Sequence, residues 1–269
     1  MAGISSQRIK SGDAEIAYWS LGDGAPVVLL HPFPVNHEFW LPVAEPLSAR
    51  YRLVLPDLRG HGESEAGDGP ATMEKHAADI VRVMDDAGVG RAAMIGVSIG
   101  GYALFEFWRQ HRGRISALVL CNTKAPADGA EARAARLQAA NDVLERGAGP
   151  FFESMIPKLF GETTREARPD LVDGALRMMR VMSPENIAQV QRGMAERPDS
   201  IDTLKTINVP TLLVTGNEDI MTGVNEAELM RQHIPGSQLR VIPKAGHYSP
   251  WEQPQEALRI LRQFLDGLR

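Results

Sequence analysis

The stretch of sequence that decides the fold is MIGVSIGGYAL, residues 94–104. It begins with apolar residues typical of a buried strand, continues with G-x-S-x-G from Gly96 to Gly100, and ends in residues that a helix tolerates. A strand-to-helix turn of this kind is too sharp for neighbouring Cβ atoms, so the two glycines give Ser98 room and raise its Oγ above the strand ends. The pattern predicts a nucleophilic serine.

A glycine-rich turn between a strand and a helix also occurs in proteins that bind dinucleotide phosphates. Ser98 occupies the position of the second glycine in G-x-G-x-x-G, and no basic residue follows to complete a phosphate-binding loop. The sequence therefore favours a nucleophile here over the dinucleotide site of an oxidoreductase.

Short apolar runs bounded by Gly, Pro or Asp lie on both sides of the motif and are separated by helical patterns. This alternation predicts an α/β fold, with a mostly parallel central sheet and helices on both faces. Residues 21–24, which read LGDG, predict a hairpin after the first strand. The predicted strands cover residues 14–20, 26–30, 51–55, 92–97, 115–121, 211–215 and 238–242, and the clearest helices cover 71–87, 225–233 and 255–268.

The alternation stops after Cys121 and resumes at Val209. The residues between them are rich in Ala, Glu, Arg and Met, with proline and glycine breaks that indicate several short helices. We therefore predict a core formed by residues 1–121 and 200–269, and a helical lid, residues 122–199, inserted after the sixth strand. Such a lid would roof Ser98 and supply most of the pocket wall.

Composition limits the partners and the compartment. The chain has 269 residues and a formal net charge of −5, with no long run of one sign, so nucleic acid and anionic membranes are unfavourable partners. No apolar run approaches the length of a membrane span, and the single cysteine, Cys121, suits a reducing cytosol. We expect a cytoplasmic protein, and the sequence leaves a homodimer open.

A serine nucleophile needs a general base and a group that orients that base. His247 lies in PKAGHYSP directly after the last predicted strand, and Asp219 lies in VTGNED after the strand before it, so both fall at the carboxyl ends of strands. The chain order Ser98, Asp219, His247 is the order expected for this turn. Glu218 is the competing carboxylate, and we prefer Asp219 for its shorter side chain.

Acyl transfer also needs donors for an oxyanion. One candidate is the backbone N–H of Ile99, which directly follows the nucleophile. The other is the N–H of Phe33, because its neighbours Pro32 and Pro34 have none to offer.

Together these residues resemble the α/β-hydrolase fold family over essentially the whole chain. The segment Asp57-Leu58-Arg59-Gly60-His61-Gly62-Glu63-Ser64 is similar to the family's D-x-R-G-x-G-x-S, which implies a structural role. Within the family, Leu118 to Thr123 followed by a helical insert resembles the lidded carboxylesterases and 3-oxoadipate enol-lactonases.

These observations predict a serine hydrolase that cleaves a small carboxylic ester or lactone through an acyl-enzyme on Ser98, with no metal and no cofactor. A C–C bond hydrolase with the same triad remains an alternative, as does a ligand receptor on this fold that does not turn over. Four apolar side chains are the candidates for the substrate pocket: Trp40, Met155, Phe160 and Trp251.

Overall fold

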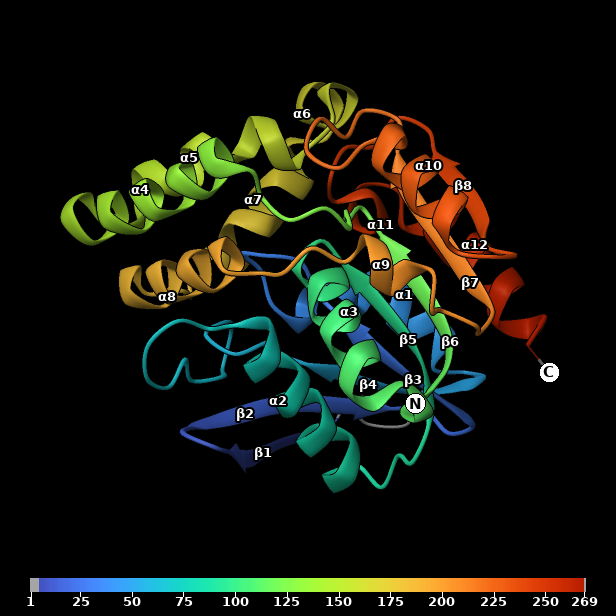
Figure 1. Ribbon diagram of the computed structural model, residues 1–269. Coiled ribbons are helices and arrows are strands. Elements are labelled where there is room, and N and C mark those ends of the chain that lie inside the picture. The colour runs from blue at the N-terminus through green and yellow to red at the C-terminus, as the bar shows by residue number, and fades with distance from the viewer. Residues whose placement is uncertain (1–4, 269) are drawn as a thin grey trace.

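An eight-stranded sheet runs through the centre of the protein in the computed structural model, which describes residues 5–268 (Figure 1). The strand order is β1-β2-β4-β3-β5-β6-β7-β8. Only the pairs β1/β2 and β2/β4 are antiparallel, so the predicted, mostly parallel sheet is confirmed. The strands are β1 (Ser5–Ser11), β2 (Ala14–Leu21), β3 (Ala25–Leu30), β4 (Tyr51–Pro56), β5 (Ala92–Val97), β6 (Ile115–Cys121), β7 (Thr211–Gly216) and β8 (Gln238–Ile242).

Helices cover both faces of the sheet, as predicted. Helices α2 (Met73–Asp86) and α3 (Ile99–His111) pack together in front of it in Figure 1, and α1 (Leu41–Leu47) packs on α12 (Pro254–Asp266) behind it. The remaining helices are α4 (Ala130–Arg146), α5 (Ala148–Leu159), α6 (Glu162–Ala167), α7 (Pro169–Met179), α8 (Pro184–Ala195), α9 (Ile201–Leu204), α10 (Val224–His233) and α11 (Ser249–Glu252), with short 3-10 turns η1 (His37–Trp40) and η2 (Arg112–Arg114).

Burial on both faces explains the uninterrupted apolar runs. Every residue of β5 is buried between β3 and β6, and α3 packs on this strand. A polar side chain in such a strand would lose its water without gaining a partner. The strand that carries the serine turn is therefore fully buried and paired on both sides.

The predicted hairpin at residues 21–24 is wrong. Strand β2 pairs with β1 through a two-residue turn at Gly12-Asp13, and on its other side with β4, so β3 lies one strand further along. Gly22 has a φ of 77°, and a Cβ there would lie 2.3 Å from the Tyr51 carbonyl oxygen. The glycine therefore serves a close passage past the start of β4 and not a turn between paired strands.

Helices α4 to α8 follow β6 and form what we call the helical insertion, residues 130–195. In Figure 1 the insertion lies above the sheet, on the side where β5 ends and Ser98 follows, and α4 packs along α8. Its elements fall within the predicted range 122–199, and the division into core and lid stays a prediction. Within residues 5–268, none of the helices has both the length and the apolar character needed to span a bilayer.

Candidate active site

Ser98 stands on a strained turn between β5 and α3. Its φ is 53° and its ψ is −113°, a backbone conformation that residues other than glycine rarely adopt. A Cβ on Gly96 would lie 2.5 Å from the carbonyl carbon of Gly100, so the turn closes only with glycine there. The Ser98 N–H donates to the Cys121 carbonyl at 3.0 Å, and its own carbonyl accepts from the Thr123 hydroxyl at 2.9 Å. Strain held in place by its surroundings is typical of functional sites.

His247 and Asp219 form a buried pair. His247 Nδ1 lies 3.0 Å from Asp219 Oδ2, and the two residues are 1% and 8% exposed. Burial alone would raise the pKa of the Asp219 carboxyl, but the charge and hydrogen bond of His247, with further donors, lower it far below the ordinary value of 3.8. A carboxylate on Nδ1–H leaves Nε2 free to accept a proton.

Several residues that hold Asp219 were missed by sequence reasoning. Asn122 Nδ2 donates to Asp219 Oδ2 at 2.8 Å, and Thr222 donates to the same carboxylate from its hydroxyl at 2.8 Å and its N–H at 3.0 Å. Ser249 in turn donates its hydroxyl to Asn122 Oδ1 at 2.5 Å. Asn122 directly follows β6 and has a φ of 42°, so its backbone is also strained. The one signal available was a polar residue directly after a buried strand.

Glu218 and Glu252 tie the helical insertion to the two loops that carry this pair. Glu218, the competing triad acid, accepts from the N–H of Thr163 at 2.9 Å and from its hydroxyl at 2.5 Å. Glu252 is 3% exposed and accepts from the N–H groups of Gly161 and Gly246, both at 2.9 Å, and of Tyr248 at 3.2 Å. Burial raises the pKa of Glu252, against the effect of these donors.

Glu218 is bonded to Thr163, whereas Asp219 is the carboxylate that lies beside the histidine ring. The structure thus pairs Asp219, and not Glu218, with the histidine.

The loop after β3 approaches the same place. The Tyr248 hydroxyl donates to the Phe33 carbonyl at 2.9 Å, and this fixes the loop to the residue after His247. His31 Nδ1 donates to the Pro32 carbonyl at 2.9 Å, while its Nε2 accepts from the Leu58 N–H at 2.9 Å. The two prolines and these hydrogen bonds restrict the conformation of the Phe33 peptide, and the predicted oxyanion donor would need such preorganisation.

A cavity of about 550 Å³ joins these parts. Ser98, Phe33 and His247 line it together with Met155, and the rest of its wall comes largely from α4 and α5 of the helical insertion. Tyr102 and Phe151, which the sequence analysis did not select for the pocket, also line it. A concave site with a serine, a paired histidine and an apolar wall can bind and attack a small carbonyl compound.

The predictions for three of the four pocket side chains are corrected, because none of the three lines this cavity. Trp40 is 0% exposed and meets Phe39 edge to face within the core. Phe160 packs on Tyr248, with ring centroids 5.4 Å apart. Trp251 donates its indole N–H to the Leu171 carbonyl at 3.0 Å, which turns its ring toward α7. Trp40 and Trp251 are close in sequence to Phe33 and His247, and Phe160 belongs to the helical insertion, but neither position brings the side chain into the cavity lining.

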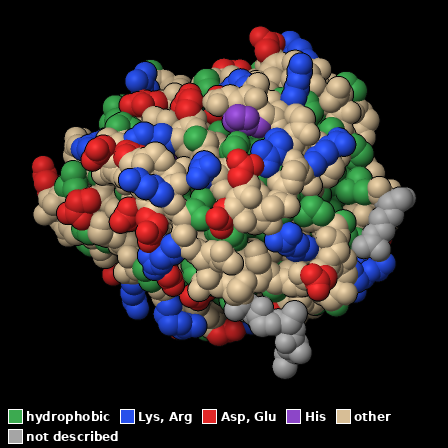
Figure 2. All heavy atoms as spheres, turned by 90° about the horizontal axis from the view of Figure 1, so that it is seen from below, with side chains coloured by type: hydrophobic (Ala, Val, Ile, Leu, Met, Phe, Trp, Pro, Cys, Tyr) green, Lys and Arg blue, Asp and Glu red, His purple; other side chains and the backbone are tan. Residues whose placement is uncertain are grey.

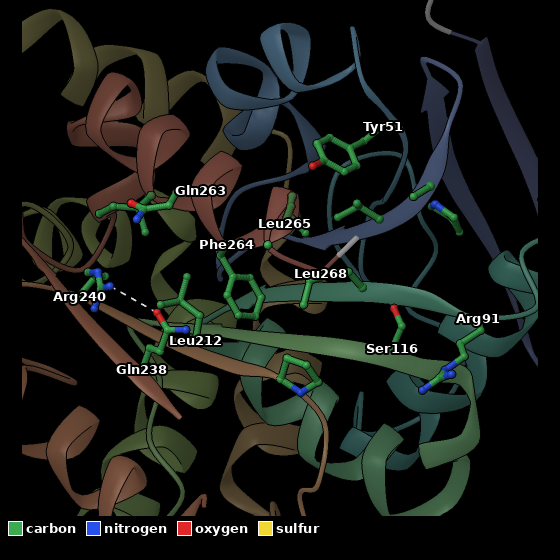
Figure 3. Close-up of a pocket in the computed structure, with 17 residues that line it drawn as sticks. Tyr51, Arg91, Ser116, Leu212, Gln238, Arg240, Gln263, Phe264, Leu265 and Leu268 are labelled. Atoms are coloured by element: carbon green, nitrogen blue, oxygen red, sulfur yellow. Dashed lines mark hydrogen bonds between the residues drawn. The ribbon is translucent and has the colours of Figure 1, made fainter. Parts of the chain in front are cut away.

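A second cavity, of about 530 Å³, lies at the opposite, amino-terminal ends of the strands beneath α12 (Figure 3). Phe264, Leu265 and Leu268 cover it, and Ser116 is among its polar groups. The described residues that line it include no histidine and no carboxylate, so Ser116 has no base there. Residues 5–268 also contain no group of three or more His, Cys, Asp or Glu side chains placed to hold a metal ion.

Comparison with known proteins agrees with this geometry. The family model described as alpha/beta hydrolase fold matches residues 25–254. An esterase from Thermogutta terrifontis has 38% sequence identity and a TM-score of 0.94, covering 97% of this chain and 99% of its own. The enol-lactonase from Burkholderia xenovorans LB400 has 25% identity and a TM-score of 0.90, covering 97% and 100%. 3-Oxoadipate enol-lactonase 1 from Acinetobacter baylyi is 26% identical over 251 residues, 92% of this chain and 91% of its own.

Proposed function

Because the chain belongs to the alpha/beta hydrolase fold family, we propose that it is a serine hydrolase that cleaves a small carboxylic ester or lactone. The relatives named above are esterases and enol-lactonases, and they support an enzyme acting on ester bonds. The observation that carries the finer proposal is the Asp219–His247 pair, which lies at the cavity that Ser98 and Phe33 also line.

The proposed reaction uses these residues as follows. Ser98 Oγ attacks the carbonyl carbon and passes its proton to His247 Nε2, which then protonates the leaving alcohol. Asp219 holds the Nδ1–H tautomer and stabilises the charged ring that forms. The N–H groups of Phe33 and Ile99 bind the oxyanion. Water, activated by His247, then releases the acid from Ser98.

Turnover of a panel of p-nitrophenyl esters of increasing acyl length tests the proposal. Ser98→Ala should abolish turnover, because Oγ is the group that forms the acyl-enzyme, and a fluorophosphonate probe should label Ser98. Ser116→Ala is a matched control, since this serine lines the second cavity without a base. Activity of Ser98→Ala within tenfold of the parent would contradict the assignment.

The two alternatives predict different outcomes in related assays. A receptor on this fold would react once or slowly, whereas the enzyme turns over many times. A C–C bond hydrolase would cleave vinylogous diketones faster than esters with the same Ser98 dependence. We favour the ester or lactone because the named relatives act in that class.

A further inference from the structure

The charges in the wall of the cavity over Ser98 are unbalanced. Four cationic side chains and two carboxylates line it: Lys124, Arg136, Arg146 and Lys158, with Asp128 and Asp142. The cavity therefore has a surplus of positive charge, although the whole chain has a net charge of −5. On the face shown in Figure 2, in contrast, basic and acidic side chains are interspersed.

The single carboxylate of Asp128 is in contact with three cationic side chains. Its oxygens lie 3.3 Å from Lys124 Nζ, 2.5 Å from Arg136 Nε and 2.9 Å from Arg197 Nη2. Burial raises the pKa of Asp128, but Arg136 and Arg197 outweigh it and bring the pKa to about 2, so the group is a carboxylate at neutral pH. Three cations thus share one negative charge.

The other two cations of the cavity have no carboxylate partner. Within residues 5–268, Arg146 at the end of α4 and Lys158 near the end of α5 make no ion pair, and both are exposed. They lie on the same helix faces as lining residues spaced three and four positions away, such as Met155 relative to Lys158. They therefore stand at the cavity's edge.

We propose that the substrate carries a carboxylate in addition to the ester or lactone group, and that Lys158 and Arg146 recognise it. The proposal rests on the proposed function and specifies its substrate class. A cleft lined by one sign of charge concentrates ligands of the opposite sign, and its low-dielectric wall strengthens their attraction. The recognised carboxylate is not consumed: water adds across the ester bond, giving a second acid and an alcohol.

The test compares substrates that differ only in charge. Monomethyl esters of succinic, glutaric and adipic acid are paired with the methyl esters of their monoamides, and methanol release is measured. We expect kcat/KM to favour the acid over its amide by about tenfold for the best-fitting length, as expected for a charge-assisted contact. Added salt should reduce this preference, because exposed ion pairs are screened.

Variants then assign the preference to residues. Lys158→Met and Arg146→Met should each lower the acid-to-amide ratio by about threefold, the size of an exposed ion pair, and the ratio cancels any change in turnover that is common to the two esters. Arg133→Met is the matched control, because it removes the same charge from α4 at an exposed position outside the cavity lining. Inhibition by glutarate, compared with glutaramide, gives a second readout that needs no turnover.

Each outcome bears on a different claim. If p-nitrophenyl acetate is hydrolysed in a Ser98-dependent manner but the acid and amide esters react equally, the inference is overturned and the proposed function stands. If Lys158→Met, Arg146→Met and Arg133→Met lower the ratio equally, the preference comes from overall charge and the assignment to the cavity is overturned. Absence of Ser98-dependent turnover for every ester would remove both.

Discussion

The Tyr248 hydroxyl donates a hydrogen bond of 2.9 Å to the Phe33 carbonyl, so the residue after His247 holds the loop that contains Phe33, the proposed oxyanion donor. Both residues are buried, and the Tyr248 N–H also donates a hydrogen bond of 3.2 Å to the Glu252 carboxylate. Two parts of the site that are far apart in the chain are therefore positioned by one side chain.

Tyr248→Phe should lower kcat by about tenfold with a smaller change in KM, because the Phe33 peptide loses the bond that orients it. The unsatisfied carbonyl should also cost about 1–3 kcal/mol in the free energy of unfolding. Tyr18→Phe is the control, since it removes a hydroxyl bonded to Asp86 at 2.6 Å far from the cavity. Equal kcat values for the two variants would argue against the coupling.

Asp219→Asn should reduce kcat by up to about 10⁴, because an amide favours the wrong tautomer of His247. Glu218→Gln should have a far smaller effect, since Glu218 bonds Thr163 and not the histidine. Steady-state kinetics of both variants on one ester measures the difference. A larger loss in Glu218→Gln would identify Glu218 as the triad acid.

Glu252→Gln should lower kcat without abolishing the acyl-enzyme. An amide cannot accept all three N–H groups that now converge on the carboxylate, so the His247 loop and Gly161 of the helical insertion lose part of their common anchor. Burst kinetics separates the two half-reactions. Should kcat remain unchanged while only the melting temperature falls, Glu252 is purely structural.

The sequence predicted the site residues whose position depends on the conformation of the neighbouring backbone. The glycines around Ser98 and the strand-end positions of Asp219 and His247 can be identified because turn geometry and strand order constrain the residue type. Asn122, Glu252 and Tyr248 escaped prediction because their partners lie 91 to 215 positions away in several cases. Strand β1 was missed because its outward residues are polar and mostly exposed, which leaves no apolar alternation to detect.

Three buried histidines should make the fold sensitive to acid. Burial lowers the pKa of His31 to about 4, of His76 to about 3, and of His61 well below 6.5. Between about pH 6.5 and pH 4 the unfolded chain binds protons that the folded chain does not, so the free energy of unfolding falls as the pH falls. Each histidine contributes at most about 1.4 kcal/mol per pH unit.

His76→Leu tests the contribution of one buried histidine to this pH dependence. The substitution breaks no hydrogen bond, because neither ring nitrogen of His76 has a partner among the described residues. The slope of unfolding free energy against pH should decrease by about one proton between pH 6 and pH 4.5, as measured by urea unfolding. An unchanged slope would mean that His76 is protonated in the folded state. The Asp219 carboxylate does not account for this change in slope, because its lowered pKa changes the free energy of unfolding mainly as the pH falls through about 3.8 and below.

Met155 and Phe160 differ in what they should control, although both belong to the same stretch of the chain. Met155 lines the cavity with Ser98, whereas Phe160 packs on Tyr248 outside the lining. Met155→Ala should therefore enlarge the acyl pocket and raise kcat/KM for a longer acyl ester relative to a short one, by up to about tenfold. Phe160→Ala should leave that ratio unchanged and lower the free energy of unfolding by about 3–5 kcal/mol, because it leaves a void in a packed region. If Met155→Ala loses stability without changing the ratio, acyl length is set by the core loop around Phe33 and not by the helical insertion.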